Sequence, residues 1–279
     1  MAEIHWFPGH MKKALNNITE KIKLVDIVIE ILDARAPFSS INPDLEKVIN
    51  NKKRLAVLSK IDLADPELTK YWVDKLSKDF DMLLCLNLND PKSTKVLSSA
   101  VSKLGEEKHA KEKAKGMKPQ PLKTMIIGVP NVGKSSLINR LANRKAAGVQ
   151  NKPGYTRGEQ FIKVNNDFVL LDTPGVLPMN YENKVSATHL ALTGAVREDI
   201  LPNEVLVEAL LKHLRKHYPD SLKERYGVEV IEDDQKVLSQ IATRRGLVSG
   251  DTTENLLRAE SILLKDFKDG KLGRITLDC

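Results

Sequence analysis

The feature that most constrains the fold is a glycine-rich loop at residues 128–135, with the sequence Gly-Val-Pro-Asn-Val-Gly-Lys-Ser. It fits the pattern G-x-x-x-x-G-K-[ST], in which backbone N–H groups surround a polyphosphate. The apolar run 124–127 predicts a strand before the loop, and the spacing of residues 136–141 predicts a helix after it. The phosphates would lie at that helix N-terminus, where the dipole favours anions. This setting disfavours a chance glycine-rich turn.

Within the loop, we expect Lys134 to reach the β- and γ-phosphates and the Ser135 hydroxyl to bind Mg²⁺. Asn131 is either a K⁺ ligand beside the phosphates or a side chain that only structures the loop. The expected triphosphate contacts in this stretch are Asn131, Val132, Gly133, Lys134, Ser135 and Ser136.

Composition places the chain among soluble globular proteins. Its 279 residues suffice for one large or two modest domains, and 41% are hydrophobic while 29% are charged. No apolar run reaches the length of a membrane span, and residues 1–6 do not form a signal peptide. The two cysteines, Cys85 and Cys279, have neither metal-site spacing nor a disulfide framework, so we expect a reducing cytoplasm.

The net charge of +7 is unevenly distributed. Residues 181–279 contain 15 Lys and Arg against 17 Asp and Glu, whereas residues 1–180 contain 29 against 20. The excess in the first part suits a polyanionic partner such as RNA. Ordinary surface variation explains it equally well.

Strands and helices alternate through the first part of the chain. The expected strands are residues 27–33, 54–58 and 82–86, and the expected helices are residues 12–24, 43–50 and 66–78. This alternation predicts an α/β fold, a doubly wound and mostly parallel sheet with helices on both faces. A hairpin of residues 160–164 and 168–171 follows the glycine-rich loop.

Two changes of character divide the chain. Residues 102–123 are rich in lysine, contain Gly116, Pro119 and Pro121, and predict a mobile connector. Beyond residue 180 only helices are expected, at residues 186–196, 203–217, 234–245 and 253–267. We therefore expect a nucleotide-binding domain at residues 1–180 and a smaller all-α domain at residues 181–279.

Further stretches fit the same nucleotide site. Asp172 begins a D-x-x-G tetrad at a strand end, where it would support Mg²⁺ through water while the Gly175 N–H meets the γ-phosphate. Thr156 is a candidate for the threonine that closes on Mg²⁺ when a triphosphate is bound. Either signal is weak alone.

Residues Ser59, Lys60, Ile61 and Asp62 resemble the guanine-reading motif N-K-x-D, with Ser in the place of Asn. The Asp62 carboxylate can accept two hydrogen bonds that guanine offers and adenine does not, which discriminates by about 10⁴ or more. The stem of Lys60 would lie over the base. Because Ser59 lacks an amide, we expect weaker affinity for the base. Asn87 and Leu88, at the next strand end, would add backbone contacts by position alone.

The motifs run from base recognition to phosphate loop to Mg²⁺ switch, whereas ordinary G domains place the phosphate loop first. Together with the stretches 6–11, 33–37, 128–136 and 270–275, this order resembles the circularly permuted GTPases and, among them, the ribosome biogenesis GTPase A family. The resemblance covers essentially the whole chain and implies a P-loop GTPase fold. It implies a cytoplasmic bacterial factor, monomeric when free, in late assembly of the large ribosomal subunit. Its helical domain would contact rRNA, with Arg244-Arg245 and Lys212, Arg215 and Lys216 as candidates.

Val176 follows Gly175, where many small GTPases carry a glutamine that orients the attacking water. Valine has no donor or acceptor, so another group must do this. The resemblance implicates His10, whose pKa near neutrality suits the task. Slow intrinsic hydrolysis stimulated by the ribosomal particle is the leading hypothesis. A nucleotide-gated RNA-binding switch and a regulatory GTPase with a protein target are the alternatives.

Overall fold

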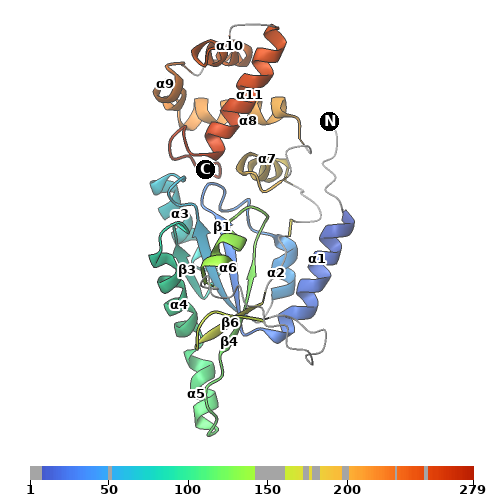
Figure 1. The fold of residues 1–279 in the computed structure, drawn as a ribbon, viewed down its shortest axis with the longest axis vertical. Coiled ribbons are helices and arrows are strands. Elements are labelled where there is room, and N and C mark those ends of the chain that lie inside the picture. The colour runs from blue at the N-terminus through green and yellow to red at the C-terminus, as the bar shows by residue number, and fades with distance from the viewer. Residues whose placement is uncertain are drawn as a thin grey trace.

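A six-stranded sheet forms the centre of the lower part of the molecule, and a group of helices lies above it (Figure 1). Across the sheet the strands follow the order β3-β2-β1-β4-β6-β5. Neighbouring strands are parallel except β5, which pairs antiparallel with β6 at one edge. The strands are β1 (Ile27–Asp33), β2 (Lys53–Ser59), β3 (Met82–Cys85), β4 (Leu122–Ile127), β5 (Phe161–Lys163) and β6 (Phe168–Leu171).

The computed structural model describes residues 8–49, 52–141, 161–171, 176–177, 183–196, 201–229, 231–247 and 251–279. The side chains of residues 8–11 and of residue 161 are outside this description. Across these ranges, no helix combines the length and the apolar character that a membrane span requires.

Strand β1 lies at the middle of the sheet and every one of its residues is buried. It pairs with β2 from Ile27 opposite Lys53 to Asp33 opposite Ser59, and with β4 on its other side. A nearly continuous apolar run is what a parallel strand covered on both faces requires. The predicted strand at residues 27–33 is therefore confirmed, and its carboxyl end lies beside that of β2.

Alternate strand residues enter different apolar clusters on the two faces. On one face Val28 packs with Ile18 and Ile22, while Leu32 packs with Trp72. On the other face Ile29 belongs to a large cluster that also holds residues of α4 and α6. The sheet-covering helices are α1 (Pro8–Lys21), continued by the 3₁₀ turn η1 (Ile22–Leu24), α2 (Pro43–Ile49), α3 (Pro66–Leu76), α4 (Lys92–Leu104) and α6 (Lys134–Leu141).

The strand before the glycine-rich loop, β4, is the fourth along the chain but lies between β1 and β6 inside the sheet. The three preceding strands all lie on one side of it, and β6 and β5 lie on the other. The expected doubly wound sheet in permuted order is thus confirmed. Permutation leaves the site intact because a site at strand ends depends on which strands are neighbours.

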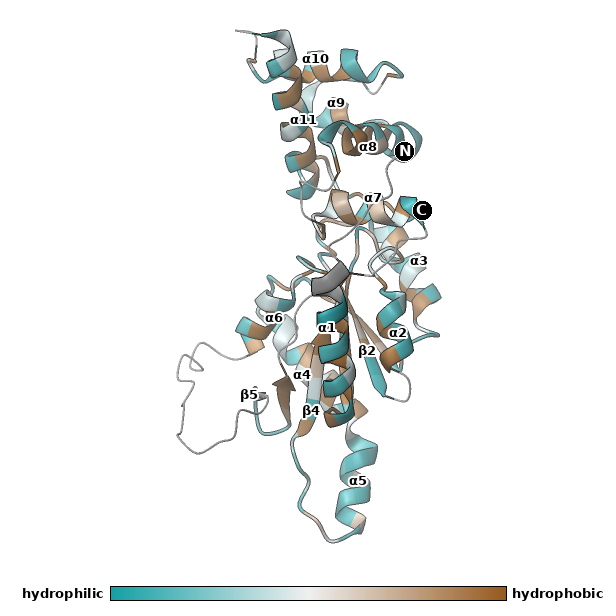
Figure 2. Cartoon of the chain, turned by 90° about the vertical axis from the view of Figure 1, so that its right-hand side faces the viewer, coloured by the Kyte–Doolittle hydropathy of each residue, from teal (hydrophilic) through white to brown (hydrophobic). Residues whose placement is uncertain are grey.

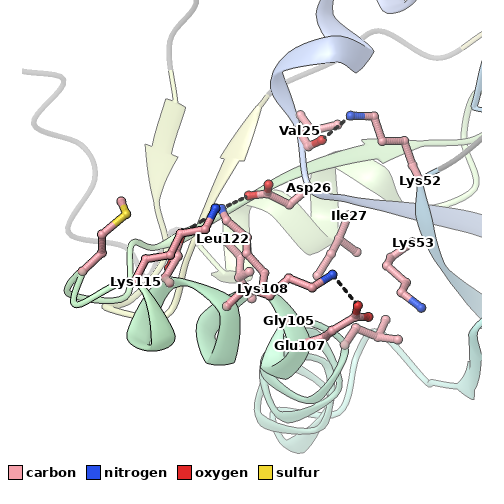
Figure 3. Close-up of a pocket in the computed structure, with 14 residues that line it drawn as sticks. Val25, Asp26, Ile27, Lys52, Lys53, Gly105, Glu107, Lys108, Lys115 and Leu122 are labelled. Atoms are coloured by element: carbon pink, nitrogen blue, oxygen red, sulfur yellow. Dashed lines mark hydrogen bonds and ion pairs between the residues drawn. The ribbon is translucent and has the colours of Figure 1, made fainter.

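The predicted mobile connector at residues 102–123 is wrong in part. Residues 102–104 end α4, residues 122–123 begin β4, and between them α5 (Glu106–Ala114) projects from the sheet as a hydrophilic helix (Figure 2). Helix α5 buries no residue, so it lacks the apolar stripe by which a helix is predicted. Lys108 anchors it, with Nζ 2.8 Å from an Asp26 carboxylate oxygen at the foot of β1 (Figure 3).

In the described residues after position 183, the upper part of the molecule consists of α7 (Lys184–Thr193), α8 (Asn203–His217), α9 (Ser221–Tyr226), α10 (Asp234–Arg244) and α11 (Thr252–Lys268). Their core includes Leu210, Leu214, Leu263 and Phe267. The sequence predicted α7, α8, α10 and α11. Their predicted ends lie within two residues of the observed ends, except the carboxyl end of α7, which differs by three. The six-residue α9 was missed because it is too short to display a helical period.

Residues 270–279, which we call the closing segment, return from α11 to the sheet. Leu272, Ile275 and Leu277 are buried although the segment contains neither helix nor strand. The Ile275 N–H donates to the Leu63 carbonyl at 3.1 Å, and the Leu277 N–H donates to that of Arg35 at 2.7 Å. The closing segment therefore joins the helical part to loops at the carboxyl end of the sheet.

Replacing Trp72 by Phe tests this attachment. The buried indole Nε1 donates to the Asp278 carbonyl at 2.8 Å, and phenylalanine keeps the aromatic packing without the donor. We expect the free energy of unfolding to fall by about 1–3 kcal/mol and the Leu277 amide to exchange faster with deuterium. Tyr71→Phe on the exposed neighbour is the matched control. Unchanged exchange at Leu277 in Trp72→Phe would contradict the assignment.

Candidate functional site

The carboxyl ends of β1, β2, β3 and β4 meet at one edge of the sheet because these strands are parallel. Four loops therefore come together there. They are residues 33–37, 59–62, 86–89 and 128–133. Three of them carry residues that the sequence assigned to a nucleotide site, and the fourth carries the Asp33–Pro37 stretch that contributed only to the family resemblance.

Two glycines shape the phosphate loop. Gly128 has φ +145°, and a Cβ there would lie 2.5 Å from the Ile31 carbonyl oxygen of β1. Gly133 has φ +109°, and a Cβ would lie 2.7 Å from Cδ1 of Leu88. Both positions have a positive φ that favours glycine. At Gly128 the neighbouring backbone oxygen also excludes a side chain, whereas at Gly133 the neighbour is the end of a flexible leucine side chain. The loop lies between β1 and the segment after β3, and it leads directly into α6.

Lys134, the first residue of α6, is 7% exposed. Its ammonium donates to the carbonyls of Gly128 at 3.0 Å and Val129 at 2.6 Å. Burial lowers the pKa of Lys134 to about 8 because both partners are uncharged. A polyphosphate in the loop would supply the opposite charge and stabilise the protonated form.

Ser59 joins the loop of residues 59–62 to the phosphate loop. Its fully buried hydroxyl lies 2.8 Å from the Val132 carbonyl oxygen and 3.0 Å from that of Leu32. One hydroxyl proton serves both acceptors, so the side chain connects the end of β2 to the phosphate loop and to β1. The weaker base affinity expected from Ser59 stays a prediction, because this contact concerns the phosphate loop.

Lys60 is held by an ion pair. It has φ 56°, and its ammonium lies 2.9 Å from Oδ2 of Asp33. Asp33 also accepts from Arg35, whose Nε and Nη2 lie 3.0 and 2.9 Å from its two carboxylate oxygens. Although burial opposes its ionisation, these two cations hold the pKa of Asp33 well below its usual range. Because the ammonium end is fixed, the Lys60 stem is held along the loop, which suits its expected place over a base.

The rest of the loop after β2 is held by the closing segment. The Arg274 guanidinium donates to the carbonyls of Ile61 at 2.7 Å and Ala64 at 2.8 Å. The side chain of Asp62 is exposed, so its carboxylate is accessible to a ligand. Arg274 is a positioning residue that the sequence analysis did not assign, although it lies in the stretch 270–275 that contributed to the resemblance.

Asn87 and Leu88 lie next to this loop because β3 pairs with β2. The Asn87 carbonyl accepts from the Ser93 hydroxyl at 2.5 Å, and its side-chain oxygen accepts from the Asn89 N–H. Leu88 is buried against Gly133. The side chains thus shape the surroundings of the phosphate loop, and backbone contact with a base stays a prediction.

Asn131 connects the phosphate loop to the helical part. It has φ 56°, and its Nδ2 donates to the Gly194 carbonyl at the end of α7 at 2.7 Å. The amide oxygen remains an acceptor, so the contact is compatible with both roles that the sequence left open. Ser135 and Ser136 are exposed in the first turn of α6, and a hydroxyl at Ser135 is a hard oxygen donor of the kind that Mg²⁺ prefers.

Val176 lies against the phosphate loop. It is buried, its N–H donates to the Gly128 carbonyl at 3.3 Å, and its carbonyl accepts from Nδ2 of Asn42 at 3.1 Å. Thr156, Asp172 and Gly175 lie outside the described residues. His10 lies in the first turn of α1, and its side chain is outside the description too. The structure therefore does not test whether these residues lie together at the site.

Arg35 is the main feature that the sequence analysis missed. It is 2% exposed, and besides binding Asp33 it donates to the carbonyls of Thr193 at 3.1 Å and Lys268 at 3.2 Å. These carbonyls end α7 and α11. The sequence did offer a signal for this buried connection. Asp33 and Arg35 are oppositely charged and two positions apart at the end of a buried strand.

This arrangement defines a P-loop GTPase whose strands occur in a circularly permuted order. Residues 123–227 match the family model described as 50S ribosome-binding GTPase. The chain is 40% identical to Ribosome biogenesis GTPase A of Bacillus cereus, over 99% of this chain and 93% of that protein. It is 41% identical to the protein of the same name from Priestia megaterium, over 99% and 96%. The chain belongs to the ribosome biogenesis GTPase A family.

Solved structures agree with this membership. The GNP-bound YlqF from Thermotoga maritima matches with a TM-score of 0.64 and 25% identity, covering 95% of this chain and 97% of that one. The GDP-bound YlqF structure matches with a TM-score of 0.67 and 25% identity, over 94% and 98%. The likeness includes both the sheet and the helical part.

The lowered pKa of Lys134 predicts proton uptake when nucleotide binds. Above pH 8 the free protein has lost much of this charge, and a bound diphosphate favours the protonated amine. At pH 9 we expect GDP binding to take up roughly one proton, whereas at pH 7 this group should take up little. The affinity for GDP should fall as pH rises through about 8. Calorimetric titration in buffers of different ionisation enthalpy measures the uptake. Lys134→Arg, which stays charged, should abolish it; equal uptake in this variant would contradict the assignment.

Ser59→Ala tests the connection between the two loops. Removal of the hydroxyl leaves a buried carbonyl without its donor, so we expect a loss of about 1–3 kcal/mol in unfolding free energy. We also expect GDP to bind up to about tenfold more weakly because the phosphate loop is less well fixed. Ser77→Ala, at the exposed end of α3, should change neither quantity. GDP affinity equal to wild type would show that the hydroxyl does not position the loop.

Proposed function

We propose that this chain hydrolyses GTP to GDP and phosphate in late assembly of the bacterial large ribosomal subunit, with turnover stimulated by the particle. The observation that supports this most directly is the phosphate loop at residues 128–135, hydrogen-bonded through Ser59 to the loop that resembles a guanine-reading motif. The chain also matches ribosome biogenesis GTPases over 99% of its length. The proposal places the protein in the cytoplasm, monomeric when free. It assigns GTP binding to residues 1–180 and ribosome contact to residues 181–279.

Guanine and phosphates would be recognised by separate groups. Asp62 would accept from the N1–H and amine of guanine, with the Lys60 stem over the ring and the backbone of Asn87 and Leu88 beside it. Lys134 and the loop N–H groups would bind the β- and γ-phosphates, and the Gly175 N–H would meet the γ-phosphate. This division lets GDP stay bound after the γ-phosphate leaves.

The proposed Mg²⁺ ligands are Ser135, Thr156 and, through water, Asp172. When bound, Mg²⁺ neutralises charge on the β- and γ-phosphate oxygens. Asn131 is the candidate ligand for K⁺, since its Nδ2 bond to Gly194 leaves its amide oxygen available.

Water activation is assigned to His10. Buried Val176 carries no polar side-chain atom, so the attacking water needs a donor or acceptor from elsewhere. Helix α1 packs in the same apolar cluster as Val176, and Figure 1 shows its first turn at the end of the sheet where the carboxyl ends of the strands lie. A neutral imidazole brought from this turn could accept a hydrogen bond from the water as it attacks the γ-phosphorus.

The RNA contacts proposed for residues 181–279 are supplemented by a second candidate surface on α5. Of the candidates on the helical part, Arg215 pairs with Asp234 and Arg245 pairs with Asp266, so these two cations are already partly neutralised. Three lysines are exposed at the end of the projecting helix α5 and in the turn after it: Lys113, Lys115 and Lys118. Such a row of lysines suits phosphate contacts that weaken steeply with salt.

Turnover with and without large ribosomal subunits, in potassium and in sodium, tests the function. We expect slow GTP hydrolysis by the free protein and stimulation by the particle, with RNA binding that falls as salt rises. Stimulation absent in both salts would remove the ribosomal proposal. Stimulation by a protein with no effect of RNA would favour the regulatory alternative, and RNA affinity that depends on nucleotide without stimulated turnover would favour the switch.

His10→Ala should lower stimulated turnover by about 10²-fold or more, in line with loss of a group that handles the attacking water. GDP affinity should remain near that of wild type, because the side chain acts on the water. His5→Ala, outside the motif, is the matched control. Stimulated turnover that survives in His10→Ala would exclude the histidine from this role.

A further inference from the structure

A cavity of about 730 Å³ lies between the helical part and α3, lined by α7, α8 and the closing segment. It is separate from the phosphate loop. Two histidines of α8 and a cysteine of the closing segment line it: His213, His217 and Cys279. The sequence predicted no metal site for Cys279, because these residues have no motif spacing along the chain. The fold brings them together.

The three side chains are grouped closely enough to share one ion. His213 and His217 are four residues apart on α8, so they lie on one helix face, with ring centroids 4.8 Å apart. One ligand atom from each of the three residues lies within 4.8 Å of the others. Ligands around tetrahedral Zn²⁺ lie roughly 3.3–3.7 Å apart, given bonds of about 2.0–2.3 Å. Small rotations of His217 and Cys279, both exposed, would close that difference.

A backbone carbonyl already orients one of the rings. Nε2 of His213 lies 3.0 Å from the Thr276 carbonyl oxygen, so an N–H at Nε2 donates to it and Nδ1 carries the lone pair. A metal-binding histidine ordinarily donates its other ring N–H in this way, which fixes the tautomer and the ring orientation. The same carbonyl lies 3.5 Å from the Cys279 sulfur. Thr276 thus orients the His213 ring, while the thiol gives up its own contact with this carbonyl when it is deprotonated.

The chemistry of the donors selects the class of ion. Two imidazoles and a thiol are borderline to soft ligands, which favour Zn²⁺, Co²⁺ or Cu ions over Mg²⁺. Asp278 and Asp65 add negative charge beside the cysteine, while Lys216 adds positive charge. On binding, the thiol loses its proton to solvent and the thiolate binds the metal. A water molecule can take the fourth position.

We propose that His213, His217 and Cys279 bind one zinc-class divalent metal ion, which ties the closing segment to α8. The closing segment also places Arg274 on the carbonyls of Ile61 and Ala64. An ion at this cavity therefore stabilises the attachment of the helical part to the loop that we assign to guanine recognition. The site stands independently of GTP hydrolysis, since none of its ligands belongs to the phosphate loop.

Cobalt substitution of the full-length, metal-free protein tests the site directly. Addition of Co²⁺ should give one thiolate-to-cobalt charge-transfer band with the visible bands of a tetrahedral complex, and Zn²⁺ should displace it. Cys279→Ser should remove the charge-transfer band, and His217→Ala should weaken Zn²⁺ binding by about 100-fold or more. Cys85→Ser is the matched control and should bind as wild type does. Excess Mg²⁺ should not compete.

Alkylation gives a second measurement that needs no variant. Zn²⁺ should protect Cys279 from iodoacetamide and leave the reaction of Cys85 unchanged. The proposal is overturned if the cobalt spectrum lacks a thiolate band, if Cys279→Ser binds Zn²⁺ as tightly as wild type, or if zinc does not protect Cys279. Each outcome is independent of GTP turnover.

Discussion

The buried carboxylate of Asp33 is the interaction on which the arrangement of the site depends. It lies at the end of the central strand and is bound by Arg35 through two parallel hydrogen bonds and by Lys60 through a third. Removing one partner of a buried pair of this kind costs about 3–5 kcal/mol, because the remaining charge stays out of water. The end of β1, the loop of residues 59–62 and the helical part are therefore held by one charge cluster.

The same residues connect the nucleotide site to the helices. Arg35 donates to the carbonyls that end α7 and α11, and Asn131 donates to that of Gly194. Arg274 donates to the Ile61 carbonyl in the loop after β2. A movement of the phosphate loop or of the loop at residues 59–62 must therefore change these contacts with the helical part. Otherwise the contacts hold the loops in place. This gives a physical route by which a bound nucleotide can bias how the helices are presented to a partner.

Local patterns predicted the elements whose periodicity or composition is strong. The apolar run of β1 and the amphipathic pattern of α8 agree with the predicted ranges to the residue. The patterns failed where the signal was weak or hidden. Helix α5 has no buried face, and α9 has only six residues. Helix α4 was missed although Leu97, Ala100 and Val101 give it an apolar face at helical spacing. The exposed α5 is held by ion pairs such as that of Lys108 with Asp26, which leave no hydrophobic period in the sequence.

The sequence by itself determined the class of protein, because a phosphate loop needs particular residues at fixed spacing and the order of the motifs requires a permuted sheet. Only the tertiary structure decided what those residues contact. Ser59 bonds to the phosphate loop, Arg35 reaches the helical part, and Cys279 lies beside two histidines of α8. These partners lie far apart along the chain, and packing of the strands and of the closing segment brings them together. Such contacts have no local signature, because the free energy that selects them comes from burial and hydrogen bonding between distant segments.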